Sequence, residues 1–187
     1  SIKKILSMKT KGVFGTVADL GKVDSKYALA LEVAAGPRIN SIVVKDDEVA
    51  ASCINMLKEN KLGVAIFLPL NKIKEREIRE ETRKIASLKG VNGLAVDLIS
   101  YPKEFKNVFS FVFGDTLVVD DVEVARKIGV GRARLVTLEG DLFEQSGAII
   151  GGYRQRKTSL FKEKHFDLEI TRLENETSSL KTSIKSL

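Results

Sequence analysis

Two stretches of this chain repeat one pattern: an apolar run, then acidic residues, then a second apolar segment. They are SIVVKDDEVAA at residues 41–51 and DTLVVDDVEVAR at residues 115–126. An apolar run of this length is typical of a buried strand, and the acids that follow it are typical N-caps of a helix. Because this strand–helix unit occurs twice in 187 residues, the sequence predicts a mixed α/β fold with two related subdomains.

Strands and helices alternate around both copies. We expect a strand at 12–17, a helix that begins after Asp24 and ends at Gly36-Pro37, and a helix capped by Asp46 or Asp47. Further strands are predicted in GVAIFLPL at 63–70 and in ARLVTLEG of the second half. The charged run KIKEREIREETRK predicts a linker or an exposed helix between the halves. The predicted boundaries are 12–72 for the first subdomain, 73–87 for the linker and 88–153 for the second.

The C-terminal segment, 154–187, carries a heptad pattern. Apolar residues recur there at alternating spacings of four and three, with Thr177 as the one polar interruption: Phe166, Ile170, Leu173, Leu180, Ile184 and Leu187. This pattern predicts one helix of a coiled coil. Residues 1–11 contain a short helical pattern. Because helical segments flank the globular region on both sides, we expect a globular domain inserted at the tip of a long helical hairpin. We also expect the chain to be a fragment of a longer protein.

Glycines surround a short apolar strand in QSGAIIGGYR, residues 145–154. A phosphate-binding loop would need a helix N-terminus directly after the glycines, and none is predicted there. Two interpretations remain, a tight turn within the chain and an edge strand that pairs with another chain. The second is favoured because the segment lacks the charges that normally protect an exposed edge. The candidate interface residues are Gly147, Ala148, Ile149, Ile150, Gly151 and Gly152.

Positive charge is concentrated at both ends of the globular region, within a net charge of +6. If the termini meet, these ends form one basic patch. Such a patch is either a solvated surface or a contact for nucleic-acid phosphates. The candidate residues for weak, sequence-independent DNA binding are Lys9, Lys11, Arg154, Arg156 and Lys157.

Residues for catalysis or metal binding are scarce. Cys53 is the only cysteine and His165 the only histidine, so neither a zinc site nor a catalytic triad is expected. Gly21-Lys22 lacks the remaining residues of a phosphate-binding loop, and no dinucleotide-binding fingerprint occurs. No apolar run is long enough for a membrane span. The residues favour a binding module without cofactor or metal over an enzyme.

Several segments together resemble the hinge domain of the structural maintenance of chromosomes (SMC) family. They are GVFGTVADL at 12–20, KYALALEVAAGPRINSIVV at 26–44, LKENKLGVAIFLPL at 57–70, FGDTLVVDDVEVA at 113–125 and LVTLEGDLFEQSGAIIGG at 135–152. The chain departs from the family pattern at Ala35 and at 63–66. It also departs at Ile150, because the family commonly has threonine at that position. These departures leave the closing glycines in place.

The resemblance implies a hinge of two similar subdomains that dimerises into a ring, with itself or with a paralogous hinge. The first subdomain of one chain would contact the second subdomain of the other, and the flanking helices would form an antiparallel coiled-coil arm. It further implies a cytoplasmic, chromosome-associated protein with a distant ATPase head, and no activity in this fragment. The alternative is a small α/β nucleotide- or ligand-binding enzyme domain.

Overall fold

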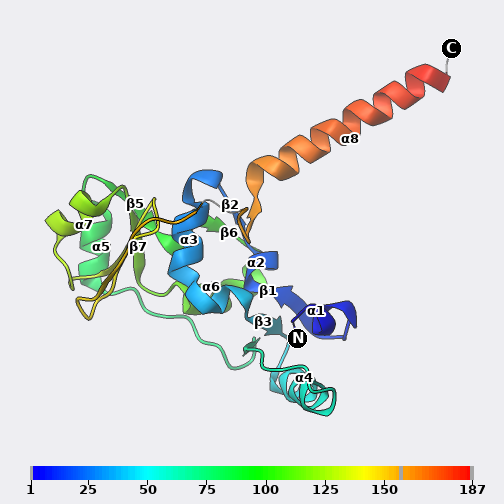
Figure 1. The fold of residues 1–187 in the computed structure, drawn as a ribbon, viewed down its shortest axis with the longest axis horizontal. Helices are drawn as coiled ribbons and strands as arrows, with labels where there is room; N and C mark the ends of the chain where they lie inside the picture. Colours follow the sequence, from blue (N-terminus) through cyan, green and yellow to red (C-terminus); the bar gives the residue numbers. More distant parts are fainter. Residues whose placement is uncertain (1, 156–157, 186–187) are drawn as a thin grey trace.

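The computed structural model describes residues 2–155 and 158–185, and within them the side chains of 162–170 lie outside the description. Figure 1 shows a mixed α/β body from which one long helix projects. The first half contains these elements: α1 (Ile2–Ser7), β1 (Val13–Thr16), α2 (Val17–Leu20), β2 (Lys22–Val23), α3 (Ala28–Ala35), β3 (Ile42–Val44), α4 (Asp47–Glu59) and β4 (Phe67–Pro69).

The second half and the C-terminal segment contain the remaining elements: α5 (Glu80–Ala86), β5 (Val91–Leu94), β6 (Ile99–Ser100), α6 (Lys106–Phe113), β7 (Thr116–Val119), α7 (Val122–Ile128), β8 (Arg134–Thr137), β9 (Leu142–Phe143), β10 (Ile149–Ile150), β11 (Lys162–Glu163) and α8 (Lys164–Lys185). Short 3-10 turns connect several of them: Ser25–Tyr27, Gly36–Asn40, Ala95–Leu98 and Lys103–Phe105.

The predicted helix caps are present in both halves. The Asp46 side chain accepts a hydrogen bond from Val49 N at 2.9 Å, and Asp121 does the same for Val124 N at 2.9 Å. Asp24 caps the turn that leads into α3, and α3 ends where glycine follows it, as predicted. The apolar run at 63–70 forms a shorter strand than predicted, because only Phe67–Pro69 pairs with β3.

The two halves share one sheet topology. β1 pairs antiparallel with β3, which pairs parallel with β4; β5 pairs antiparallel with β7, which pairs parallel with β8. A bulge interrupts each antiparallel pair at the same place, Gly15 in β1 and Gly93 in β5, and both glycines have φ of 135°. This conformation is one that residues with a Cβ rarely adopt. The internal repeat therefore extends well beyond the short sequence match that predicts it.

The halves differ at one sheet edge. In the second half β9 pairs with β8 and β10 pairs with β9, which gives the five-stranded order β10-β9-β8-β7-β5. The first half stops at β4, in the three-stranded order β1-β3-β4. Within the described residues, the edge of β4 therefore stays unpaired at the position where β9 covers β8 in the other half.

One hydrophobic core joins the halves. Helix α3 of the first half packs against α6, β7 and β8 of the second half. The largest cluster of buried side chains includes Val17 and Leu31 from one half with Phe109 and Val136 from the other. The Phe109 side chain is fully buried and lies 4.2 Å from the stacked ring of Tyr101, measured between ring centroids. Helix α5, within the predicted linker 73–87, packs against β5 and β7 with Ile85 buried, so the residues before α5 connect the two packed halves.

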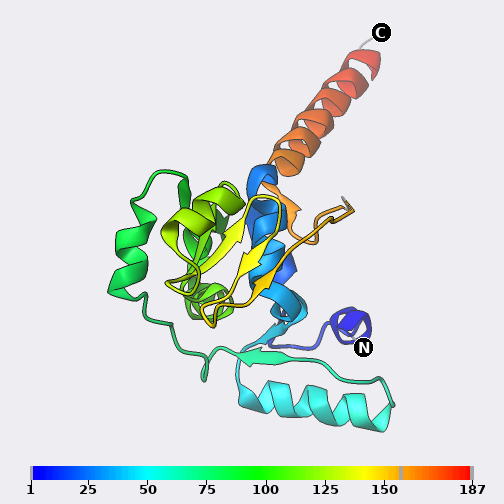
Figure 2. The same cartoon turned by 60° about the vertical axis from the view of Figure 1, so that its left-hand side comes forward.

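The C-terminal segment returns to the first half before the arm begins. β11 pairs parallel with β2, and Phe161 is buried in the shared core. The Ser159 hydroxyl donates a 2.8 Å hydrogen bond to the Glu32 carboxylate on α3. Helix α8 then leaves the body, and no other described helix lies alongside it (Figures 1 and 2), so its heptad residues Leu173, Leu180 and Ile184 are exposed.

Helix α1 lies apart from α8 in both views (Figures 1 and 2). Its Ile5 side chain is fully buried among apolar residues of β3 and α4, including Ile42 and Leu57. Cys53 belongs to the same cluster, and its burial raises the pKa of the thiol. In the single chain, α1 thus packs on the first subdomain.

Candidate functional site

The glycine-bracketed strand lies at the edge of the five-stranded sheet. Ile149 pairs with Phe143 and Ile150 with Leu142, while the other side of β10 has no neighbouring strand in the described chain. The Glu144 amide donates to the Ala148 carbonyl at 2.8 Å and closes the β9–β10 hairpin. The segment is therefore an edge strand in the single chain, and its pairing with another chain stays a prediction.

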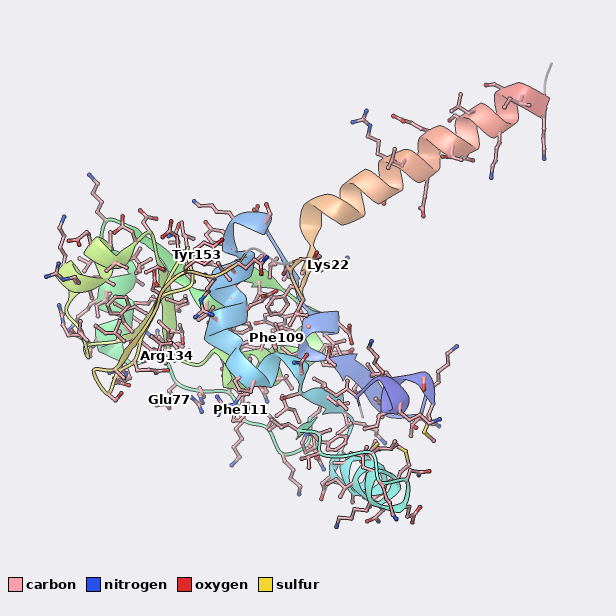
Figure 3. All side chains as sticks on the ribbon, in the orientation of Figure 1. Lys22, Glu77, Phe109, Phe111, Arg134 and Tyr153 are labelled. Carbon is pink, nitrogen blue, oxygen red and sulfur yellow. The ribbon has the colours of Figure 1, made fainter. Side chains whose placement is uncertain are left out.

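Apolar side chains on this edge face solvent. Ile149 is 56% exposed and Ile150 53% exposed, and every described residue from 145 to 155 is exposed. Tyr153, labelled in Figure 3, is 96% exposed. A bare strand edge with exposed isoleucines is a surface that favours pairing with another chain.

The glycines of this segment also have local roles within the chain. Gly147 has φ of 94° and its amide donates to the Glu144 carbonyl at 3.0 Å, so it forms the hairpin turn. A Cβ at Gly151 would lie 3.2 Å from the Cγ of Asp141 and still closer to Oδ1. Gly152 has φ of 135°. The tight-turn interpretation thus holds for Gly147, and Gly151 gives room to a neighbouring carboxylate.

Asp141 holds the chain that follows β10. Its Oδ1 accepts from the Gly152 amide at 3.2 Å, and its Oδ2 accepts from the Thr137 hydroxyl at 3.0 Å. The Thr137 hydroxyl also accepts from the Asp141 amide at 3.0 Å. This network fixes the direction of the edge strand relative to β8.

Arg134 ties the base of the hairpin to both halves. Its guanidinium forms a 3.1 Å ion pair with Glu144 and donates to the Thr116 hydroxyl at 2.9 Å and to the Ala34 carbonyl, at the end of α3, at 3.0 Å. Figure 3 labels Arg134 on β8. Because one side chain contacts α3, β7 and the hairpin, the edge strand has a fixed position relative to the first subdomain.

The second open edge, at β4, is flanked by exposed apolar residues. Val64 is 91% exposed and Ile66 is 48% exposed, directly before β4 begins at Phe67. The sequence predicts a strand here but does not single out these residues as part of a site. The sequence carries no signal that identifies them, because only the order of strands in the sheet shows that β4 lies at an edge.

The candidate DNA-binding residues do not form one patch among the described residues. Lys9 and Lys11 are exposed in the turn after α1, whereas Arg154 donates to the Gly140 carbonyl at 3.2 Å beside the second sheet. Figures 1 and 3 show α1 and Tyr153 in separate regions. Arg156 and Lys157 lie outside the described residues. Among the described residues of the single chain, the two basic ends of the globular region therefore do not meet.

Glu81 and Arg132 form an ion pair away from the strand edges. Hydrogen bonds from Arg132 lower the pKa of the partly exposed Glu81 carboxyl. In the described part of the chain, no three His, Cys, Asp or Glu side chains gather as metal ligands would, and no helix is long and apolar enough to cross a membrane.

The contact between Gly151 and Asp141 generates a prediction. Replacement Gly151→Ala should lower the free energy of unfolding by about 1–3 kcal/mol, because the new methyl group overlaps the carboxylate. In an Asp141→Ala background the same replacement should cost much less, since Cγ and both oxygens are gone. A double-mutant cycle from urea unfolding at one protein concentration measures this coupling. Additive effects of the two substitutions would contradict it.

Residues 10–129 match the family model described as SMC proteins Flexible Hinge Domain. Curated relatives include the chromosome partition protein Smc of Aquifex aeolicus, 42% identical over 172 residues, and that of Synechocystis, 46% identical over 158 residues. These alignments cover 91% and 84% of this chain but only 14% and 13% of the relatives. The chain is thus similar to a short part of those proteins.

Solved structures agree with this match. The crystal structure of the Pyrococcus furiosus SMC hinge domain has a TM-score of 0.70 and 42% identity, covering 84% of this chain and 82% of that one. An asymmetric dimer of the Geobacillus stearothermophilus SMC hinge domain has a TM-score of 0.83 and 29% identity, covering 98% and 75%. The match over residues 10–129 and the likeness in fold show that this chain belongs to the SMC family, as its flexible hinge domain.

Proposed function

We propose that this hinge joins two SMC polypeptides by pairing the β10 edge of one copy with the β4 edge of a second copy. The observation that carries the proposal is that β10 and β4 each leave a sheet edge open beside exposed apolar residues. Each edge presents backbone donors and acceptors that a strand from another chain can satisfy. The contact would merge a five-stranded and a three-stranded sheet.

Two-fold symmetry makes this contact close on itself. If β10 of one copy pairs with β4 of the other, the same operation brings the remaining β4 and β10 together. Two equal contacts leave neither β4 nor β10 free for further copies, so the assembly stops at a dimer. This is the ring that the family resemblance implies. The hinge domain of the Geobacillus stearothermophilus relative crystallised as an asymmetric dimer, which supports the pairing of two copies and not the equality of the two contacts.

Apolar burial would supply the affinity. Ile149, Ile150, Val64 and Ile66 retain large exposed fractions in the single chain. Burying the exposed half of an isoleucine contributes about 1 kcal/mol, and two contacts double the total. The backbone hydrogen bonds contribute chiefly register and direction, because they replace bonds to water.

The exposed heptad residues of α8 support a role in connecting arms. A helix with Leu173, Leu180 and Ile184 exposed along one seam suits a partner helix. We propose that this partner is the helix preceding the hinge in the full polypeptide, and that the dimer links two arms of a chromosome-organising ATPase near the nucleoid. The hinge itself would be non-catalytic and would need no cofactor.

The dimer proposal predicts that Ile149→Glu yields a monomer at micromolar concentration, because dimerisation would bury an unpaired carboxylate. Light scattering after size exclusion measures the mass. Leu88→Glu is a matched control, since Leu88 is 46% exposed and precedes β5 at the opposite edge of the same sheet. A wild-type monomer, or a dimer that survives Ile149→Glu, would refute the proposed edge.

We further propose that exposed basic residues contact DNA weakly and without sequence preference. Lys9 and Lys11 are exposed beside the first subdomain, and Lys157 belongs to the second basic cluster of the sequence. In the dimer, clusters from two copies would add their charge. Such binding rests on phosphate contacts and falls steeply as salt rises.

Reversal of three charges, Lys9→Glu, Lys11→Glu and Lys157→Glu, should weaken binding of a random-sequence oligonucleotide and flatten its salt dependence. Fluorescence anisotropy at several salt concentrations measures both effects. The control triple variant Lys58→Glu, Lys89→Glu and Lys103→Glu changes net charge equally at exposed positions elsewhere. Equal weakening by both triple variants would point to general charge and against a local DNA surface.

A further inference from the structure

A cavity of about 350 Å³ lies between the two halves at the base of the β9–β10 hairpin. Charged side chains from four parts of the chain line it: Arg38 after α3, Arg76 from the linker, Asp115 beside β7, and Arg134 with Glu144 from β8 and the hairpin. Figure 3 labels Arg134 and Phe111, which mark this region. The elements that form it are the ones that join the subdomains.

The charges of this cavity are only partly neutralised. Glu144 pairs with Arg134 at 3.1 Å, and Asp115 pairs through Oδ2 with Arg79 at 2.6 Å. Among the residues that the structure describes, neither Arg38 nor Arg76 takes part in a salt bridge. Two arginines therefore remain as uncompensated positive charge beside one cavity.

Both arginines lie against one aromatic ring. The Cζ atom of Arg38 is 5.1 Å and that of Arg76 is 5.3 Å from the centroid of Phe111, which lies on α6. Contact with an aromatic ring restricts a guanidinium while its N–H groups stay available to hydrogen-bond acceptors. Gly114 adds to this arrangement, because a Cβ there would lie 3.1 Å from Nη1 of Arg76.

Asp115 balances part of this charge. Its Oδ2 accepts from Arg79 and, at 2.7 Å, from the Thr82 hydroxyl. Its Oδ1 is buried away from solvent and has no hydrogen-bond partner in the described part of the chain, so a ligand in the cavity does not reach this oxygen. The groups that a ligand would contact are therefore the two arginines outside any described salt bridge.

We propose that this cavity binds a small phosphate-bearing molecule, with its phosphate on Arg38 and Arg76. Planar guanidinium groups bind phosphate oxygens in pairs, which suits a terminal phosphate with three free oxygens. A half-open cavity of this size suits such a small ligand better than a nucleic-acid backbone, which needs a continuous groove. None of the residues that line this cavity is among the candidate DNA-binding residues.

Isothermal titration with inorganic pyrophosphate at constant ionic strength tests the phosphate contact. We expect saturable binding of one pyrophosphate per chain, weakened about tenfold or more by Arg38→Gln with Arg76→Gln, since charge-assisted hydrogen bonds are lost. Arg83→Gln with Arg126→Gln removes the same charge at exposed positions outside the cavity and should leave the affinity unchanged. Circular dichroism of both double variants verifies folding.

Arg76→Lys should bind with intermediate affinity, because lysine retains the charge but loses the planar fork. No binding of millimolar pyrophosphate by the wild type, or equal weakening in the Arg83 and Arg126 variant, would overturn the proposal. Displacement of pyrophosphate by a single-stranded oligonucleotide without a terminal phosphate would assign the cavity to nucleic acid and would also overturn it.

Discussion

The open sheet edges of β4 and β10 are the constraint on which the proposed assembly of this hinge depends. Each edge exposes backbone groups and isoleucine side chains, and the described residues of the single chain offer neither edge a partner strand. The internal repeat explains why β4 is open: its equivalent, β8, is covered by β9, and the first half has no such hairpin among its described strands. The asymmetry between two otherwise similar halves thus creates the two complementary surfaces.

The packing between the halves determines how those surfaces are oriented. Helix α3 covers strands of the second half, and Arg134 connects the end of α3 to the hairpin. Glu32, also on α3, holds the segment from which α8 departs. Through one helix, the position of the arm is therefore coupled to the position of the β10 edge. These contacts would link the orientation of the arm to the proposed dimer contact.

Local features of this fold could be predicted from the sequence, and long-range ones could not. Asp46 and Asp121 predict helix starts because capping depends on residues three positions apart. The edge location of 149–150 was predictable from missing charges. The opening at β4 was not, because apolar residues such as Val64 resemble any buried strand. Likewise, Arg38, Arg76 and Arg134 are far apart in sequence, and only the packing of α3 against the second sheet brings them to one cavity.

Cysteine cross-linking between the two edges tests the central claim, that β4 of one copy meets β10 of the other, most directly. In a Cys53→Ala background, one protein would carry Ile66→Cys and a second Ile150→Cys. After exchange and oxidation, the mixture should yield a covalent dimer of one chain of each kind, because only the unlike edges meet. A covalent dimer formed by the Ile150→Cys protein alone, or a non-covalent dimer whose mixture never cross-links, would contradict the account.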